Sequence, residues 1–349
     1  MAPKRKQSDQ GVSKYKIEPP KKKGFAVETA HDQIKLHCLL LALAKRGGGK
    51  SVAVGSLLNS LRKEGSLHRL FVITPTWGSN KEIFKDLPID EADVYSPDDP
   101  NSVEDIISKV EQEAEEYRDW EHRTEVYRKM TAALSKCKTD EDILHLDPDL
   151  LIEAMQMDAM THKPEHKYGG KRPVLALLVD DSQCTRLFRQ QQFLNLAIRH
   201  RHIGDGLGVS IFMLVQNYTA QSGGMPKAIR DNVTHLMLFR TKNSKVLSTI
   251  QEEISDDVEE EEFFRVYDAA TSKGPHDFLF IDWHPKEHQT KFRRNFEEYI
   301  PSAADDPLAH AGKRKHGKGA GNSRLQRSSG PAAAAGVPQP GKGNDRHGH

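Results

Sequence analysis

Short, nearly continuous apolar runs recur along the chain, separated by longer segments in which polar and apolar residues mix. They cover residues 36–43, 70–73, 174–179, 209–215, 235–239 and 278–281. Runs of this length and character predict strands buried on both faces of a parallel sheet. The mixed segments between them are long enough for the crossover helices that parallel strands require. The pattern therefore predicts an α/β fold, in which residues 278–281 form an edge strand.

Residues 88–170 interrupt this alternation. Ser102 and Asp105 have the spacing of a capping box, and apolar residues at helical spacing follow them into a long charged segment. Asp147 followed by Pro148 predicts the N-cap and first turn of a second helix. We therefore expect a helical, acidic insertion at 88–170, between the second and third predicted strands.

The formal net charge of +1 hides an uneven distribution of charge. Residues 1–24 carry a net +6 and residues 301–349 a net +5, which leaves −10 for residues 25–300. Both ends are too polar, or too rich in Pro, Ala and Gly, to build a core, so we expect disordered basic tails around one acidic domain. The basic clusters at 3–6 and 19–23 are compatible with nuclear import, with nucleic-acid contact or with a merely solubilising role.

The cysteine content and the hydropathy indicate the compartment. Cys38, Cys137 and Cys184 form no CxxC pair, which favours a reducing environment, and no Cys/His spacing resembles a zinc site. No apolar run approaches the roughly 18–20 residues of a membrane span, and no apolar signal region follows the charged N-terminus. We expect a soluble intracellular protein with no membrane partner.

The segment after the first predicted strand has the residue types of a phosphate-binding loop. It reads Ala44-Lys45-Arg46-Gly47-Gly48-Gly49-Lys50-Ser51 and continues through Val52 into a helix-compatible stretch. Successive glycines let backbone N–H groups approach phosphate oxygens, and a helix N-terminus adds positive potential. Lys50 would reach the β- and γ-phosphates of ATP, and the Ser51 hydroxyl would hold Mg²⁺. Ala44 stands where the GxxxxGK[ST] motif opens with Gly, and Ala does not tolerate a turn with positive φ.

The third and fourth predicted strands end in polar residues. Asp180 and Asp181 close the third strand, and we assign Asp180 to the Mg²⁺ shell and Asp181 to the attacking water. An Asp-Asp pair could also simply cap a helix. Gln216 follows the fourth strand, which we expect between the other two, where its amide could contact both the γ-phosphate and the water.

Two arginines are candidates for a role across a subunit contact. Arg199 lies between the third and fourth predicted strands, and Arg230 follows the fourth. An arginine supplied by a neighbouring subunit can neutralise charge in the transition state of phosphoryl transfer. The alternative for each is an ordinary solvated surface charge.

The order of these motifs resembles the FtsK–HerA-type genome-packaging ATPases of poxviruses, other nucleocytoplasmic large DNA viruses and virophages. The resemblance covers about residues 34–300 and rests on residues 47–51, 178–181, 199–200, 216–218, 226–232 and 238–240. It implies a RecA-like (ASCE-type) P-loop core, ATP and Mg²⁺ as ligands, and a homo-oligomeric ring of six subunits. It further implies ATP-driven translocation of double-stranded DNA into a capsid, with capsid or portal proteins as partners. The corresponding locations are the host nucleus, a cytoplasmic virus factory or the virion.

Two other functions remain compatible with the same residues. A HerA-like helicase or a transposition-linked ATPase would use the same core, and only the helicase would separate a forked duplex. A nucleotide-gated scaffold would bind ATP, assemble and recruit DNA or capsid through its tails, and it would release no phosphate.

Overall fold

The computed structural model describes residues 27, 34–160, 162–219, 224–254, 258–285 and 290–302, without the side chain of Asp140. The chain divides into two compact units, Met1–Asp306 and Pro307–His349, and all described residues belong to the first. The tail expected at 1–24, and all but two residues of that expected at 301–349, lie outside the described residues.

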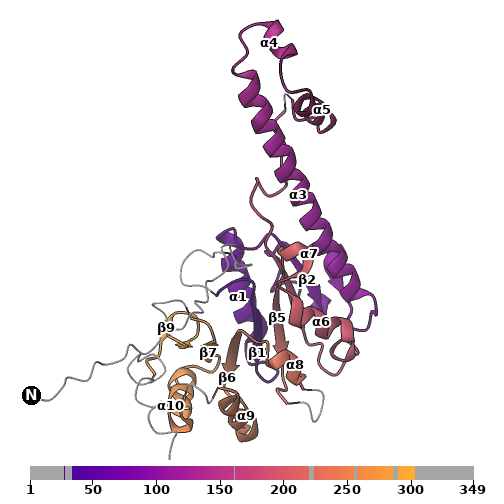
Figure 1. The fold of residues 1–349 in the computed structure, drawn as a ribbon. Helices are drawn as coiled ribbons and strands as arrows, with labels where there is room; N and C mark the ends of the chain where they lie inside the picture. The colour runs from indigo at the N-terminus through magenta and orange to yellow at the C-terminus, as the bar shows by residue number, and fades with distance from the viewer. Residues whose placement is uncertain are drawn as a thin grey trace, which may run out of the picture. The chain divides into compact units, whose positions relative to one another are not determined.

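Among the described residues, a single nine-stranded sheet has the order β3-β2-β4-β5-β1-β6-β7-β8-β9 (Figure 1). The strands are β1 (Leu39–Leu43), β2 (Arg69–Ile73), β3 (Val94–Tyr95), β4 (Leu175–Asp180), β5 (Ser210–Val215), β6 (His235–Phe239), β7 (Phe278–Asp282), β8 (Phe292–Arg294) and β9 (Glu298–Tyr299). All pairs from β3 to β6 are parallel, whereas β7, β8 and β9 add antiparallel pairs. The prediction of an α/β fold with a mostly parallel central sheet is confirmed, and β5 lies between β1 and β4 as expected.

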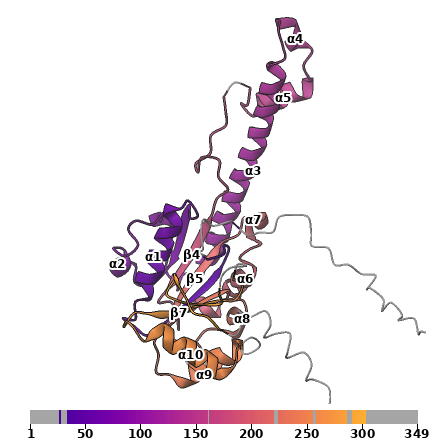
Figure 2. The same cartoon turned by 90° about the vertical axis from the view of Figure 1, so that its left-hand side faces the viewer.

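Helices cover both faces of this sheet (Figure 2). On one face, α1 (Lys50–Lys63) and the short α2 (Trp77–Asn80) lie against the strands. The other face carries α3 (Ser102–Leu134), α6 (Gln191–Arg199), α7 (Ile203–Gly206), α8 (Lys227–Arg230), α9 (Ser244–Ile254) and α10 (Glu260–Thr271). Two short 3₁₀ helices, η1 (Glu91–Asp93) and η2 (Leu187–Arg189), lie in the connections.

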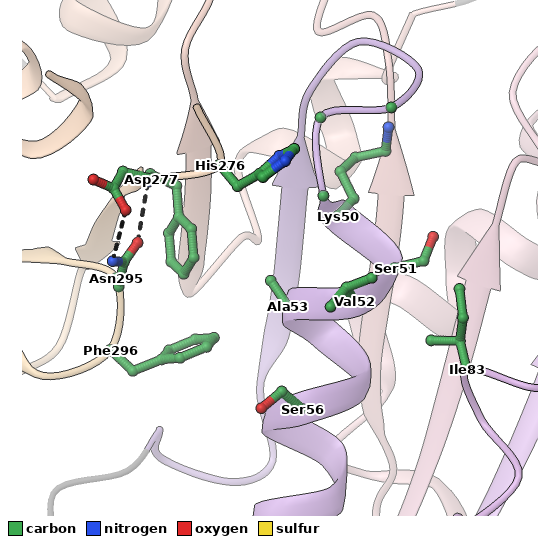
Figure 3. A pocket seen from close by; sticks show the side chains of 14 residues that line it. Lys50, Ser51, Val52, Ala53, Ser56, Ile83, His276, Asp277, Asn295 and Phe296 are labelled. Carbon is green, nitrogen blue, oxygen red and sulfur yellow. Dashed lines mark hydrogen bonds between the residues drawn. The ribbon is translucent and has the colours of Figure 1, made fainter. Parts of the chain in front are cut away.

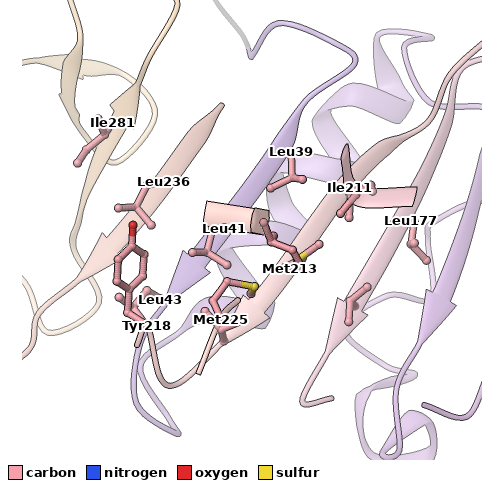
Figure 4. Close-up of a cluster of buried hydrophobic side chains, with 14 of the residues drawn as sticks. Leu39, Leu41, Leu43, Leu177, Ile211, Met213, Tyr218, Met225, Leu236 and Ile281 are labelled. Atoms are coloured by element: carbon pink, nitrogen blue, oxygen red, sulfur yellow. The ribbon is translucent and has the colours of Figure 1, made fainter. Parts of the chain in front are cut away.

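The strands are buried on both faces because their apolar residues alternate between two core clusters. Leu39, Leu41 and Ile211 belong to the cluster under α6 and α8–α10 (Figure 4), and Leu40 and Phe212 belong to the cluster under α1. This alternation follows from the two-residue period of side chains along a strand. It explains why the apolar runs in the sequence are continuous.

Two details of the strand prediction were wrong. Residues 278–281 do not form an edge strand, because β7 pairs with β6 on one side and β8 on the other. β8 escaped prediction since it carries Arg293 and Arg294 in place of an apolar run. The Arg293 side chain is nevertheless buried, in an ion pair with Asp282 at 3.3 Å. The first strand is also shorter than expected, and Leu36 instead makes an isolated bridge with Val27.

The segment after β3 is helical, as expected. It contains α3, α4 (Asp140–Leu144) and α5 (Pro148–Gln156). Asp147 caps α5 by accepting a hydrogen bond from the Asp149 amide at 3.0 Å, which confirms that helix start. The capping box at Ser102 was wrong: α3 begins at Ser102 itself, whose hydroxyl donates to the Asp99 carbonyl. The extent of the insertion at 88–170 stays a prediction. Separately, no helix among the described residues has the length and apolar character to cross a bilayer.

The first half of α3 is fastened to β2 by a cluster of ion pairs. Arg69 of β2 donates to Asp93 at 2.7 and 2.8 Å and to Glu113 of α3 at 2.9 Å. Lys109 also pairs with Asp93, and Lys167 with Glu113. Both carboxylates are buried, so they depend on these cations for compensation. The second half of α3 packs instead against α5, in a separate small apolar cluster.

Replacing Arg69 tests this attachment. We expect Arg69→Met to lower the free energy of unfolding by about 2 kcal/mol, less than the full ~3–5 kcal/mol of a broken buried pair, since Lys109 and Lys167 remain. The matched control is Arg118→Met, which removes an exposed ion pair between α3 and Asp205 and should cost at most about 1 kcal/mol. Urea denaturation of both variants measures the difference, and equal losses would contradict the account.

Candidate active site

The loop at 44–49 joins the carboxyl end of β1 to the start of α1. Its backbone has positive φ at Gly47 (76°) and at Gly49 (96°), the N-cap of α1. Ala44 is not among the described non-glycine residues with positive φ, and its amide donates to the Val215 carbonyl at 3.1 Å. A Cβ atom at Gly48 would lie only 2.7 Å from that of Ala44. Ala44 therefore fits the loop without strain, and Gly48 makes room for its methyl group.

Lys50 is the first residue of α1, and its side chain turns back into the loop. The Nζ atom donates to the carbonyl oxygens of Ala44 at 2.8 Å and Lys45 at 3.3 Å. Burial lowers the pKa of Lys50, and the nearby carboxylates of Asp180 and Asp181 oppose that shift. The loop thus holds a cationic group beside the carboxylates that end β4.

Asp180, the last residue of β4, is the most buried acid of this cluster. Its Oδ2 atom accepts hydrogen bonds from the Ser51 hydroxyl at 3.3 Å and from Asn80 Nδ2 at 3.0 Å. Burial raises the pKa of Asp180, although Ser51 and Lys50 act in the opposite direction. Carboxylate and hydroxyl oxygens side by side form a donor set that suits Mg²⁺.

Asp181 and Gln216 connect the ends of β4 and β5. Asp181 is exposed and has a positive φ of 49°, and its Oδ1 accepts from Gln216 Nε2 at 3.0 Å. Gln183 holds the two ends together: its Oε1 accepts from the amides of Gln216 (2.5 Å) and Asn217 (2.9 Å), and its Nε2 donates to the Asn217 carbonyl at 2.7 Å. Hydrogen bonds therefore link the ends of the two strands directly.

These side chains surround one cavity of about 200 Å³. Of the residues predicted from the sequence, it is lined by Arg46, Gly47, Lys50, Ser51, Asp180, Asp181 and Gln216. Sequence reasoning missed Thr76, Ser79, Asn80 and Gln183, which line it too. Thr76 and Asn80 follow the carboxyl end of β2, so polar residues after a buried strand were the available signal.

A second cavity, of about 720 Å³, adjoins the same loop and also contacts Gly47, Lys50 and Ser51 (Figure 3). Val52, predicted to bind nucleotide, lines this second cavity. Its other walls come from Ile83 and from the segments around the start of β7 and after β8, in which no residue was predicted to be functional.

This single chain does not bring Arg199 to the cavity. Arg199 is exposed at the end of α6, and the carbonyl of the next residue, His200, accepts from the Val209 amide just before β5. Gln216 follows the opposite end of β5, whose six residues span about 20 Å. A role for Arg199 across a subunit contact stays a prediction.

Arg230 is engaged within its own chain. Its Nε forms an ion pair with Glu253 at 2.9 Å, its Nη1 donates to the Met225 carbonyl at 3.0 Å, and its guanidinium lies over the Tyr218 ring. It does not line the cavity around Asp180. A role in trans stays a prediction here as well, and it would require these contacts to open.

No protein-family model and no curated protein sequence matches this chain. Among solved structures, EssC (ATPases 2 and 3) from Geobacillus thermodenitrificans is similar at 14% identity and a TM-score of 0.40, over 80% of this chain and 42% of EssC. The genome packaging NTPase B204 of Sulfolobus turreted icosahedral virus 2, in complex with sulfate, has 12% identity and a TM-score of 0.35, over 70% of this chain and 91% of B204.

The conjugation coupling protein TcpA of pCW3, in its monomer form with ATPγS, has 15% identity and a TM-score of 0.38, over 76% of this chain and 63% of TcpA. This chain thus spans less than two thirds of the EssC and TcpA chains. Similarities this weak carry no inference about its function.

The buried carboxylate of Asp180 gives a pH-dependent prediction. Burial raises the pKa of Asp180 in the folded protein, so the folded state keeps this proton to a higher pH than the unfolded state does. The free energy of unfolding therefore falls as the pH rises from about 3.8 through the raised pKa. We expect Asp180→Asn to be more stable than the wild type at pH 7, with the difference shrinking as the pH falls toward 4. Urea denaturation across this range measures it.

The control is Asp98→Asn, which removes an exposed carboxylate and should leave the free energy of unfolding nearly constant relative to the wild type. An Asp180→Asn protein that is less stable than the wild type at pH 7 contradicts the electrostatic description of this site.

Proposed function

We propose that this chain is an ATP-driven motor that translocates double-stranded DNA into a viral capsid as a ring of identical subunits. The observation that carries the proposal is the convergence of Lys50, Ser51, Asp180, Asp181 and Gln216 on one cavity at the carboxyl edge of β1, β4 and β5. These residue types are those that phosphoryl transfer from a nucleoside triphosphate requires. The order of motifs along the sequence, which resembles that of packaging ATPases, supports the DNA substrate.

The loop would hold the triphosphate of ATP. Backbone N–H groups at 47–51 and the N-terminus of the 14-residue helix α1 supply positive potential without side chains. Lys50 would exchange its hydrogen bonds to the Ala44 and Lys45 carbonyls for bonds to the β- and γ-phosphates. The Lys50 ammonium group is therefore already held within the loop, where the phosphates would bind.

Ser51 and Asp180 fit the requirements of a magnesium site. Their oxygens lie 3.3 Å apart, and the buried carboxylate gains a compensating charge when a cation is present. Asn80 would keep the Asp180 carboxylate in orientation through its own hydrogen bond. Ser51 and Asp180 would hold Mg²⁺ at this place, and the cation would supply neutralisation of the negative charge that develops during phosphoryl transfer.

Asp181 and Gln216 would act on the attacking water. Asp181 is exposed to the cavity and can accept a hydrogen bond or a proton from that water. Gln216, bonded to Asp181, can donate to the γ-phosphate and so respond to its loss. Gln183 would carry this response into the backbone at 216–217, through its three hydrogen bonds there.

The negative charge of the central region limits which parts of the chain could bind DNA. The region at 25–300 has a net charge of −10, so attraction to the phosphate backbone falls to local contacts and to the basic segments at 1–24 and 301–349. Binding through such segments releases counterions and weakens steeply with salt. An arginine from a neighbouring subunit, Arg199 or Arg230, would complete the ATP site of the ring.

Removing the loop lysine tests the proposal. We expect Lys50→Ala to lower the ATP turnover number by about 100-fold or more, since one preorganised cationic donor is lost from the transition state. Lys63→Ala is the matched control, because Lys63 is an exposed lysine at the far end of the same helix and should turn over ATP at the wild-type rate. Phosphate release measures both, and undiminished release by Lys50→Ala overturns the proposal.

A further inference from the structure

The cavity of about 720 Å³ beside the loop has no part in the chemistry described so far (Figure 3). Its lining includes Gly47, Lys50 and Ser51 but neither Asp180 nor Asp181, so it extends from the loop away from the carboxylates. A volume of this size lies in the range of pockets for small organic ligands, roughly 300–1,000 Å³. Its continuity with the loop suggests that it receives the rest of a molecule whose phosphates lie in the loop.

One wall of this cavity is formed by α1. Val52, Ala53 and Ser56 face it along successive positions of the helix (Figure 3). The Val52 side chain is 63% exposed, although Val is usually buried in a folded domain. This wall therefore offers apolar surface that a flat, weakly polar group would cover.

Two aromatic rings, those of His276 and Phe296, also line the cavity. The His276 ring lies against the loop, so that a Cβ atom on Gly49 would be only 3.2 Å from its Nδ1 atom. Phe296 is held by edge-on contacts with Phe278 (centroids 5.1 Å apart) and Phe280 (5.7 Å). Figure 3 shows the Phe296 ring reaching from the turn after β8 toward α1. Rings held in this way provide surfaces on which a heterocyclic base can stack.

A polar pair lies opposite α1. Asn295 Nδ2 donates to Asp277 Oδ1 at 3.1 Å, and Asn295 Oδ1 accepts from the Phe278 amide at 3.2 Å. The Asn295 amide thus has its oxygen and one N–H engaged in these bonds, whereas the Asp277 carboxylate, which is only an acceptor, has capacity for further donors. A ligand group at this edge should therefore carry an N–H donor.

We propose that this cavity binds the purine base of the nucleoside triphosphate, with Phe296 and His276 as stacking surfaces and Asp277 as the acceptor for an exocyclic amino group. The proposal rests on the proposed function, because it takes the loop to bind a nucleoside triphosphate. The segments next to β7 and β8 would then select the base of the nucleotide, whereas the segments after β1, β4 and β5 would act on its phosphates.

The test separates base binding from phosphate binding. Dissociation constants are measured for ATP and for inorganic tripolyphosphate, which has no base, using the full chain with Mg²⁺. We expect Phe296→Ala to weaken ATP binding about tenfold and to leave tripolyphosphate binding unchanged. The matched control is Phe264→Ala, which removes a partly buried ring on α10 outside the cavity and should alter neither constant.

Asp277→Ala provides an independent arm if Phe296→Ala does not fold. The wild type should bind ATP about tenfold more tightly than purine riboside triphosphate, which lacks the amino group, and Asp277→Ala should bind both alike. The base site is overturned if Phe296→Ala weakens both ligands equally or neither, or if Asp277→Ala keeps the preference for ATP. If the wild type binds neither ATP nor tripolyphosphate, the proposed function fails together with it.

Discussion

The parallel register of β1, β5 and β4 is the constraint on which the rest of the site depends. Leu43 pairs with Val215 and Leu214 with Asp180, so the three strands end at the same level. Parallel strands direct their carboxyl ends to one edge, and ligands of open α/β sheets bind there. The loop after β1, the acids at the end of β4 and Gln216 after β5 are therefore neighbours, although Ser51 and Asp180 lie 129 residues apart in sequence and Asp181 and Gln216 lie 35 apart. Apolar burial on both faces of the sheet holds that register.

At the same edge of the sheet, two ionisable side chains are buried, which lowers the stability of their charged forms. Burial shifts the pKa of Asp180 upward and that of Lys50 downward, so both side chains would be easier to hold in their neutral forms. Their mutual attraction and the donors from Ser51 and Asn80 offset part of this cost. Groups with such opposed environments are frequent at functional sites. Under the proposed function, a triphosphate with its cation would compensate both charges.

Local sequence patterns predicted the central strands, the loop at 44–51 and the acids at 180–181, because each depends on a short continuous run of residues. The loop accepts Ala44 because Gly48 has no Cβ atom that would collide with the Ala44 methyl group. The motif alone does not show that these two residues lie so close together. Asn80 and Gln183 were missed, although each follows a predicted buried strand closely. The wall formed by Asp277 and Phe296 was beyond prediction, since it reaches the loop only through the pairing of distant strands. β8 was missed because it is not an apolar run: its buried Arg293 is compensated by an ion pair with Asp282 and a contact with the Phe280 ring. A role for Arg199 or Arg230 in hydrolysis would require a neighbouring subunit, and no pattern within one chain locates such a partner.

The central claim is that ATP hydrolysis at this edge is coupled to duplex DNA in an assembled ring. The most direct measurement is the rate of phosphate release per subunit, recorded with and without duplex DNA over a range of protein concentrations. The account predicts that DNA raises this rate, and that the rate per subunit also rises with protein concentration as rings assemble. Release that is absent under all conditions, or that is indifferent to both DNA and protein concentration, would contradict it.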